Sequence, residues 1–279
     1  MIINHNLTAM NAYRNLASVN ERVDKNMEKL SSGMRINRAA DDAAGLAISE
    51  KMRGQIKGLN MATKNSQDGI SLIQTAEGAL NETHSILQRM RELSVQSAND
   101  TNTTEDREKL QLEMNQLRQE LDRVSTSTEF NTRKLLTGEY AEGGLTFHIG
   151  ANKDQNVKFQ VADMGATYLK VNGATDEEAV SISTQDDANV AIEIVNNALE
   201  RVSEERAKFG ALQNRLEHTI NNLRVSGENL QASESRIRDA DMANEMVSLN
   251  KDKIISQSGT AMLAQANAKP QSVLQLLQN

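Results

Sequence analysis

The sequence has little that interrupts helices and little that fills a wide core. It contains one proline, Pro270, where ordinary usage would give about fourteen in a chain of this length. Aromatic residues make up 3% of the 279 residues, and tryptophan is absent. Thin helical bundles need neither proline-rich turns nor large aromatic side chains. The composition therefore favours long, thin helical elements.

Other absences exclude whole classes of protein. Without cysteine there are no disulfides and no thiolate metal sites. A net charge of −7 argues against a general nucleic-acid binder, and no run of eighteen apolar residues predicts a transmembrane helix. The first residues lack the basic region and apolar segment of a cleavable signal. We therefore expect a protein that stays inside the cell or leaves it without a cleaved leader.

A seven-residue apolar repeat dominates the C-terminal half of the chain. Every seventh residue is apolar at Ala188, Val195, Val202, Phe209, Leu216, Leu223, Leu230 and Ile237. Such a repeat predicts a long helix with one narrow apolar stripe. At 1.5 Å per residue, fifty residues would make a rod of roughly 75 Å, which needs a partner of similar length.

The N-terminal half supplies that partner. A second heptad pattern runs from about Leu46 to Asn99, and a third seam follows to about Ser127. The polar turn between them, with Thr103 or Thr104 as helix cap, predicts antiparallel neighbours. The expected core of this antiparallel helical bundle, a coiled-coil rod, comprises Val195, Val202, Phe209, Leu216, Leu223, Leu230, Leu110, Leu117 and Val124.

A small β insertion is expected in the middle of the chain. Apolar and polar residues alternate over 145–149 and again over 157–161, which predicts a β-hairpin. Val180 and Ile182 could add a short strand. The insertion occupies about 130–183, so the predicted fold class is mainly α with a small β-hairpin.

Each end of the chain carries an amphipathic helix with few large apolar residues. Residues 33–45 read as an irregular connector, and Pro270 should kink or interrupt the last helix unless the last turn starts afresh there. We expect a discontinuous terminal domain, 1–43 plus 235–279, beside a rod domain, 44–234. The terminal helices bury little surface, so we expect them to order fully against copies in an assembly. The expected contact residues are Leu7, Met10, Leu16, Val23, Leu263, Val273 and Leu277.

No constellation of catalytic or metal-binding residues is recognisable. The four histidines (His5, His84, His148 and His218) have no second ligand at metal-binding spacing. Nucleotide-binding and nucleophile-elbow motifs are also missing. Two acidic pairs, Asp41 with Asp42 and Asp239 with Asp241, are interpreted as helix caps. We predict no enzyme, no cofactor and no metal.

Four runs closely resemble the signatures of bacterial flagellin. They are KLSSGMRINRAADDAAGLAIS at 29–49, NSQDGISLIQTAEGAL at 65–80, SRIRDADMA at 235–243 and AMLAQAN at 261–267. The resemblance implies a short flagellin with only the inner domains of the filament subunit. It implies export in an unfolded state by the flagellar type III apparatus, assembly at the filament tip, and a motility role outside the cell.

The resemblance also implies partners. These are other copies of the chain, an export chaperone on the C-terminal region, the filament cap and the hook-junction proteins, without membrane insertion. The run QRMRELSVQ at 88–96 resembles the segment of flagellins that a Toll-like receptor recognises, with Arg89, Leu93 and Glu113 as contacts. A hook–filament junction protein and a monomeric coiled-coil adaptor stay open as alternatives.

Overall fold

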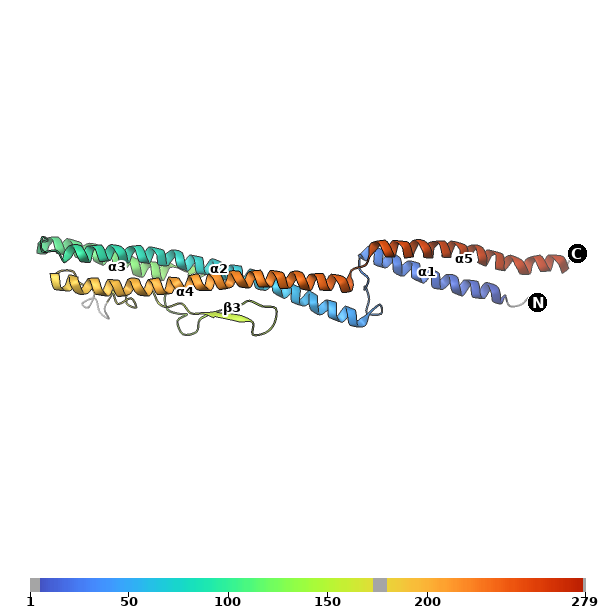
Figure 1. The fold of residues 1–279 in the computed structure, drawn as a ribbon, viewed down its shortest axis with the longest axis horizontal. Helices are drawn as coiled ribbons and strands as arrows, with labels where there is room; N and C mark the ends of the chain where they lie inside the picture. Colours follow the sequence, from blue (N-terminus) through green and yellow to red (C-terminus); the bar gives the residue numbers. More distant parts are fainter. Residues whose placement is uncertain (1–5, 173–179, 278–279) are drawn as a thin grey trace. The chain divides into compact units, whose positions relative to one another are not determined.

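The computed structural model describes residues 6–172 and 180–277, with side chains up to residue 269. The described chain is mainly α-helical with small antiparallel strand pairs, which confirms the predicted fold class (Figure 1). Its elements are α1 (Leu7–Ser32), α2 (Ala43–Ser97), α3 (Thr104–Ser127), β1 (Glu129–Phe130), β2 (Arg133–Lys134), β3 (Leu145–His148), β4 (Asn156–Phe159), α4 (Gln185–Arg238) and α5 (Met242–Leu277).

The chain divides into two compact units. Unit 1 comprises residues 1–56 and 228–279, and unit 2 comprises residues 57–227. Both divisions fall inside helices, because α2 and α4 are continuous there. The sequence placed the domain boundaries instead at 43/44, at the start of α2, and at 234/235, in the last turn of α4.

Unit 2 is built around the apolar stripe of α4. The side chains of Val195, Val202, Phe209 and Leu216 are completely buried, and Leu223 retains 9% exposure. Leu230, which lies in unit 1, is half-buried. The heptad spacing puts these residues on one side of α4, where the partner helices cover them.

Helix α2 faces this stripe with alternating large and small residues. Ile73, Leu80 and Leu87 are fully buried at one heptad position. At the neighbouring position Gly69 brings the backbone close to other elements: a Cβ there would lie 3.3 Å from the Phe147 ring and 3.4 Å from Leu216. Small residues on α2 therefore permit close packing.

Helix α3 begins at a capping box. Thr103 Oγ1 accepts a hydrogen bond from the Asp106 N–H, and the Asp106 carboxylate accepts one from the Thr103 N–H. The seam of α3 faces the core, with Met114 and Leu121 buried and Leu110, Leu117 and Val124 half-buried. The predicted turn and the Thr103 cap are confirmed.

The β insertion packs on this helical core. Strands β3 and β4 pair antiparallel, which confirms the predicted hairpin, and the register places Leu145 opposite Phe159 and Phe147 opposite Val157. Phe159 meets Phe209 of α4 edge to face, with ring centroids 5.1 Å apart. The sequence reading missed the two-residue strands β1 and β2.

Two local predictions were wrong. Val180 and Ile182 form no strand; they are buried in an irregular segment whose backbone bonds to helix side chains. Gln111 Oε1 accepts a hydrogen bond from the Ile182 N–H, and Ser97 Oγ donates one to the Ile182 carbonyl. Helix α5 continues past Pro270 to Leu277 without interruption.

Candidate assembly surface

Helices α1 and α5 of unit 1 lie side by side along most of their length (Figure 1). They run antiparallel, since the start of α1 bonds to the late part of α5 through Asn6 Nδ2 and the Ala266 carbonyl, 2.8 Å apart. Small residues allow the close approach: a Cβ on Gly259 would lie 3.2 Å from Leu16 Cδ1. The pair is therefore thin as well as long.

Little apolar surface is buried in unit 1. Among the described apolar residues of this unit, Val19, Ile36 and Leu249 are the buried ones. Unit 2, in contrast, contains the continuous hydrophobic core. Because stability follows buried apolar area, the α1/α5 pair contributes little of it.

Hydrogen bonds and ion pairs between polar side chains connect α1 and α5 instead. Asp252 accepts hydrogen bonds from Arg22 and from Asn26, Lys29 pairs with Glu245 at 3.3 Å, and Ser256 bonds to Asn20. Asn26 and Asp252 are themselves buried, with 9% and 7% exposure. Sequence reasoning missed this set, although Asn26 stands seven residues after Val19 and so breaks an apolar heptad position.

The two connectors of unit 1 meet in a short antiparallel contact. Gly33 ends α1 in the left-handed conformation, at φ 69°, and its N–H bonds to the Lys29 carbonyl. Met34 then forms a β-bridge with Asp239, and the Arg35 N–H donates to the Arg238 carbonyl at 2.7 Å. Both connectors thus meet beside the end of the terminal helix pair.

The acidic residues of the connectors have different structural roles. Asp42 caps α2 through the Gly45 N–H, and Asp241 caps α5 through the Ala243 N–H, as predicted. Asp41 is no helix cap: its carboxylate accepts the N–H groups of Arg38 and Asn37, which lowers its pKa. Asp239 is no cap either, since it accepts a hydrogen bond from Ser235 Oγ.

The outer faces of α1 and α5 expose large apolar side chains. The exposed set in these two helices is Leu7, Met10, Tyr13, Met27, Met242, Met246, Val247, Ile254, Ile255 and Met262. We call this set the assembly surface. Exposed apolar side chains on two paired helices make this set a candidate site of protein–protein contact.

The residues predicted as filament contacts divide by exposure. Leu7 and Met10 are 61% and 57% exposed, and belong to the assembly surface. Leu16, Val23 and Leu263 are half-buried. The side chains of Val273 and Leu277 lie outside the described residues. The sequence reading did not single out the exposed α5 residues Val247 and Ile254, which depart from its apolar face.

The predicted receptor contacts lie together in unit 2. Arg89 Nε and Glu113 Oε1 are 2.8 Å apart across α2 and α3, and both side chains are nearly half exposed. This ion pair, together with Glu92, raises the Arg89 pKa. Leu93 is fully buried in the core. The side chains of Arg89 and Glu113 are therefore accessible to a partner, whereas Leu93 packs in the hydrophobic core.

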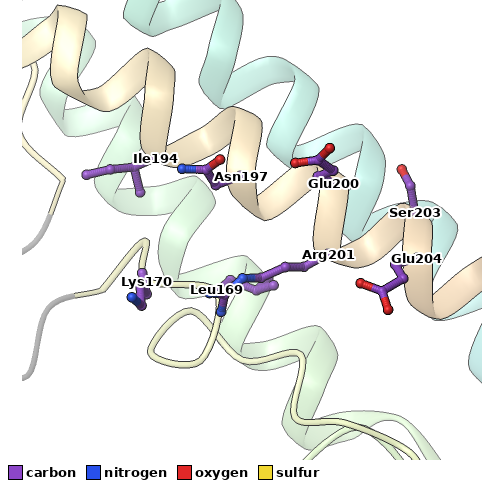
Figure 2. Close-up of a pocket in the computed structure, with 8 residues that line it drawn as sticks. All are labelled: Leu169, Lys170, Ile194, Asn197, Glu200, Arg201, Ser203 and Glu204. Atoms are coloured by element: carbon purple, nitrogen blue, oxygen red, sulfur yellow. The ribbon is translucent and has the colours of Figure 1, made fainter.

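A surface groove of 670 Å³ lies between α4 and the loop before residue 172 (Figure 2). Arg201 extends from α4 to this loop, where its Nη1 donates to the Tyr168 carbonyl at 2.8 Å and its guanidinium lies 5.6 Å from the Tyr168 ring. The remaining polar lining is mixed in charge: Lys170, Asn197, Glu200, Ser203 and Glu204. Arg201 thus holds the loop in place, and the groove lining contains no histidine or cysteine.

The described residues contain no metal-binding cluster of three or more His, Asp or Glu side chains. His84, His148 and His218 lie on α2, β3 and α4, and His5 lies outside the described residues. None of the helices described is long and apolar enough to cross a membrane.

Both the N-terminal and the C-terminal part of the chain match models of a known protein family. Residues 3–141 match the bacterial flagellin N-terminal helical region, and residues 192–277 match the bacterial flagellin C-terminal helical region. The chain is 53% identical to a flagellin of Bacillus subtilis (strain 168) over 305 residues, covering 99% of this chain and 100% of that protein. It is 53% identical over 285 residues to a flagellar filament 33 kDa core protein of Treponema phagedenis, with the same coverage.

A solved structure shares the fold. It is a putative flagellar hook-associated protein from Vibrio parahaemolyticus, matched with a TM-score of 0.59 at 13% identity, over 71% of this chain and 100% of that one. At this identity the likeness concerns the fold alone.

Proposed function

The chain belongs to the bacterial flagellin family, and from that premise we propose that its assembly surface makes the contacts between subunits of the filament. As a flagellin it is a structural protein, not an enzyme, and it polymerises with copies of itself into the extracellular filament that drives motility. The proposal assigns this self-association to α1 and α5. The observation that carries it is the exposure of Leu7, Met10 and the apolar residues of α5 on a pair with little core.

The proposal also assigns a different role to each of two domains. The terminal domain (1–43 and 235–279) would form the inner core of the filament, with Leu7, Met10, Leu16, Val23, Leu263, Val273 and Leu277 as contacts. The rod domain (44–234) would hold itself together through the residues along α3 and α4. The burial of Val202, Phe209 and Leu216 supports this assignment.

Seeded filament growth tests the assembly surface. Met10→Asp should abolish growth of filaments from fragments, as seen by electron microscopy, because a charge would enter an apolar contact. Met61→Asp is the matched control, since Met61 is also 57% exposed but lies in unit 2. Normal growth of the Met10→Asp chain would contradict the proposal.

An export chaperone would cover part of the same surface before assembly. Val247 and Ile254 of α5 are 68% and 66% exposed. Apolar side chains exposed to this degree promote aggregation unless a partner protein covers them. Titration calorimetry with the purified chaperone should show binding to the full chain and its loss in Ile254→Asp. The filament cap and the hook-junction proteins would contact the subunit through its terminal helices at the two ends of the filament.

Recognition by a Toll-like receptor would rest on the accessible ion pair of Arg89 and Glu113. Leu93 would support this pair from the core, since it is fully buried. In a receptor-reporter assay Arg89→Ala should weaken signalling without changing monomer helicity. Lys109→Ala on α3 is a suitable control, because Lys109 is exposed and forms an ion pair with Asp106 of its own helix. Full signalling by Arg89→Ala would contradict this role.

A further inference from the structure

We propose that Arg22, Asn26 and Asp252 form a register lock, which selects one antiparallel alignment of α1 and α5. The inference rests on the proposed role of these helices in subunit contact. It goes beyond that role by naming the residues that decide how the pair is aligned before a subunit is added.

The carboxylate of Asp252 has a partner for each oxygen. Oδ1 accepts hydrogen bonds from Arg22 Nε and Nη2, at 3.3 and 3.2 Å, and Oδ2 accepts one from Asn26 Nδ2 at 3.1 Å. Only 10% of the Asp252 side chain is exposed, whereas the Arg22 side chain is 49% exposed. The charge is therefore buried and paired, both carboxylate oxygens accept hydrogen bonds, and this arrangement depends on the alignment of the two helices.

The apolar residues of the pair do not select an alignment by themselves. Leu16, Val23 and Leu30 recur every seven residues on α1, so a slip of one heptad replaces one apolar residue by another. On α5, Gly259 and Ala266 are similarly interchangeable. Weak, repetitive packing of this kind tolerates slipped registers, as in coiled coils that lack a polar interface residue.

A slip of one heptad would disrupt the register lock. Asn26 lies seven residues after Val19 and seven before Gly33. Depending on the direction of the slip, Asp252 would face Val19 or the end of α1 at Gly33, without its amide partner. Asn15 or Lys29, each seven residues from Arg22, would take the place of that arginine, but the donor to Oδ2 would be lost in both directions. A buried carboxylate oxygen without a hydrogen-bond donor is unfavourable, so the slipped alignments are disfavoured.

The register lock is distinct from a stabilising contact. Replacing a buried ion pair by apolar residues often leaves stability unchanged or raises it, because the desolvation of the charges is removed. A single polar interface residue, in contrast, can specify register at a cost in stability. The chain with Asn26→Leu and Asp252→Leu should therefore retain its helicity but lose its unique alignment.

The connectors offer a competing explanation. The bridge between Met34 and Asp239 also aligns the two segments, and Arg35 Nη2 donates to the Ile237 carbonyl there. If this connector contact sets the register, removing the Arg35 side-chain hydrogen bond with Arg35→Ala should misalign the helices, while the double leucine variant should not. Arg35→Ala is thus the matched control.

The absence of cysteine allows the alignment to be read directly. Leu16→Cys, Gly259→Cys and Ala266→Cys are introduced together in the full-length chain. The Cβ positions at 16 and 259 are 3.9 Å apart, which suits a disulfide. A bond from 16 to 266 reports a slip of one heptad. After mild oxidation, tandem mass spectrometry measures the ratio of the two disulfides.

The register lock predicts a large change in this ratio. The 16–259 bond should exceed the 16–266 bond by about tenfold or more with the lock intact, as one or two charge-assisted hydrogen bonds allow. In the double leucine variant the two bonds should form in similar amounts, and Arg35→Ala should keep the original ratio. A 16–259 bond that still dominates in the double leucine variant would overturn the proposal.

Two further measurements complete the test. Asp252→Arg should bring the two disulfides toward similar amounts, because the new cation would face Arg22 in one alignment and Lys29 in the other. Adding Arg22→Glu should restore the original ratio, since the reversed ion pair forms only in the original alignment. Seeded growth of the double leucine chain, without the cysteines, should fall at least about tenfold; unchanged growth would overturn the role in assembly. If instead Met10→Asp grows normally while the disulfide ratios behave as expected, the proposed assembly surface fails and the register lock stands.

Discussion

At the scale of single residues, the same amino-acid types have different tasks in the two units. Phe209 and Leu216 on α4 are fully buried, whereas Met10 and Val247 in the terminal helices are largely exposed. Burial in unit 2 stabilises the monomer, and exposure in unit 1 leaves the apolar surface that we propose contacts other subunits. The effect of a substitution therefore depends on the unit in which it lies.

Phe209→Ala should destabilise unit 2 by about 3–5 kcal/mol, because it leaves a cavity where the ring meets Phe159. Urea unfolding followed by circular dichroism measures the change. Val225→Ala, on the same helix but 58% exposed, should change stability by less than about 0.5 kcal/mol. Equal unfolding midpoints for the two variants would contradict the packing assignment.

At the scale of elements, polar caps decide where helices begin. Thr103 starts α3, Asp42 starts α2 and Asp241 starts α5. Each side chain satisfies backbone N–H groups that have no partner inside the helix. These caps set the lengths of the antiparallel helices, and so the positions at which their heptads meet.

Thr103→Ala should lower the stability of unit 2 by about 1 kcal/mol, since the first turn of α3 loses its acceptor. The neighbouring Thr104→Ala is the control, because Thr104 lies inside the helix and alanine is tolerated there. Thermal unfolding of both variants measures the difference in stability. A larger loss in the Thr104 variant would show that the cap is assigned to the wrong residue.

The same cap makes stability depend on pH. Hydrogen bonds from the Thr103 hydroxyl and N–H lower the pKa of Asp106 in the folded state. This contribution is complete above the unfolded-state pKa of about 3.9 and is lost as the pH falls through the lower folded-state pKa. Asp106→Asn should therefore be less stable at neutral pH and flatten the acid limb of the stability curve. Parallel curves for the two proteins would exclude the linkage.

At the scale of the whole molecule, the two units differ in what holds them together. Unit 2 has a continuous hydrophobic core, whereas α1 and α5 in unit 1 are joined largely by polar contacts and small residues. Local stability follows buried apolar contacts. We therefore expect the two units to respond differently to assembly.

Leu216→Asp should unfold unit 2, because it places a charge in the core without a partner. The monomer should lose much of its helicity and of its thermal stability, both seen by circular dichroism. Val225→Asp, exposed on the same helix, should keep both. If Leu216→Asp left the monomer intact, the assignment of α4 as the spine of unit 2 would fail.

Hydrogen exchange should separate the monomer from the filament. In dilute monomer the amides of residues 7–30 and 250–269 should exchange much faster than those at the centre of α2 and α4. In the filament the terminal amides should become protected, because neighbouring subunits cover them. Strong protection of the terminal helices in dilute monomer would contradict this expectation.

Much of the fold could be predicted from sequence because heptads and caps act locally. The apolar stripe of α4, the turn with Thr103 and the hairpin of β3 and β4 follow from spacing that a single segment carries. The segment with Val180 and Ile182 was mispredicted because its alternation reflects burial alone; its N–H and C=O groups are satisfied by Gln111 and Ser97, which are distant in sequence.

The sequence by itself determined the helical class, the family signatures and the pairing of long amphipathic helices, because these depend on short-range periodicity. The tertiary structure alone decided which apolar residues stay exposed, since exposure depends on what a neighbouring element covers. It also brought Asp252 to Arg22 and Asn26 across 226 or more residues of sequence. Such a pairing depends on how distant helices align, which no single segment specifies.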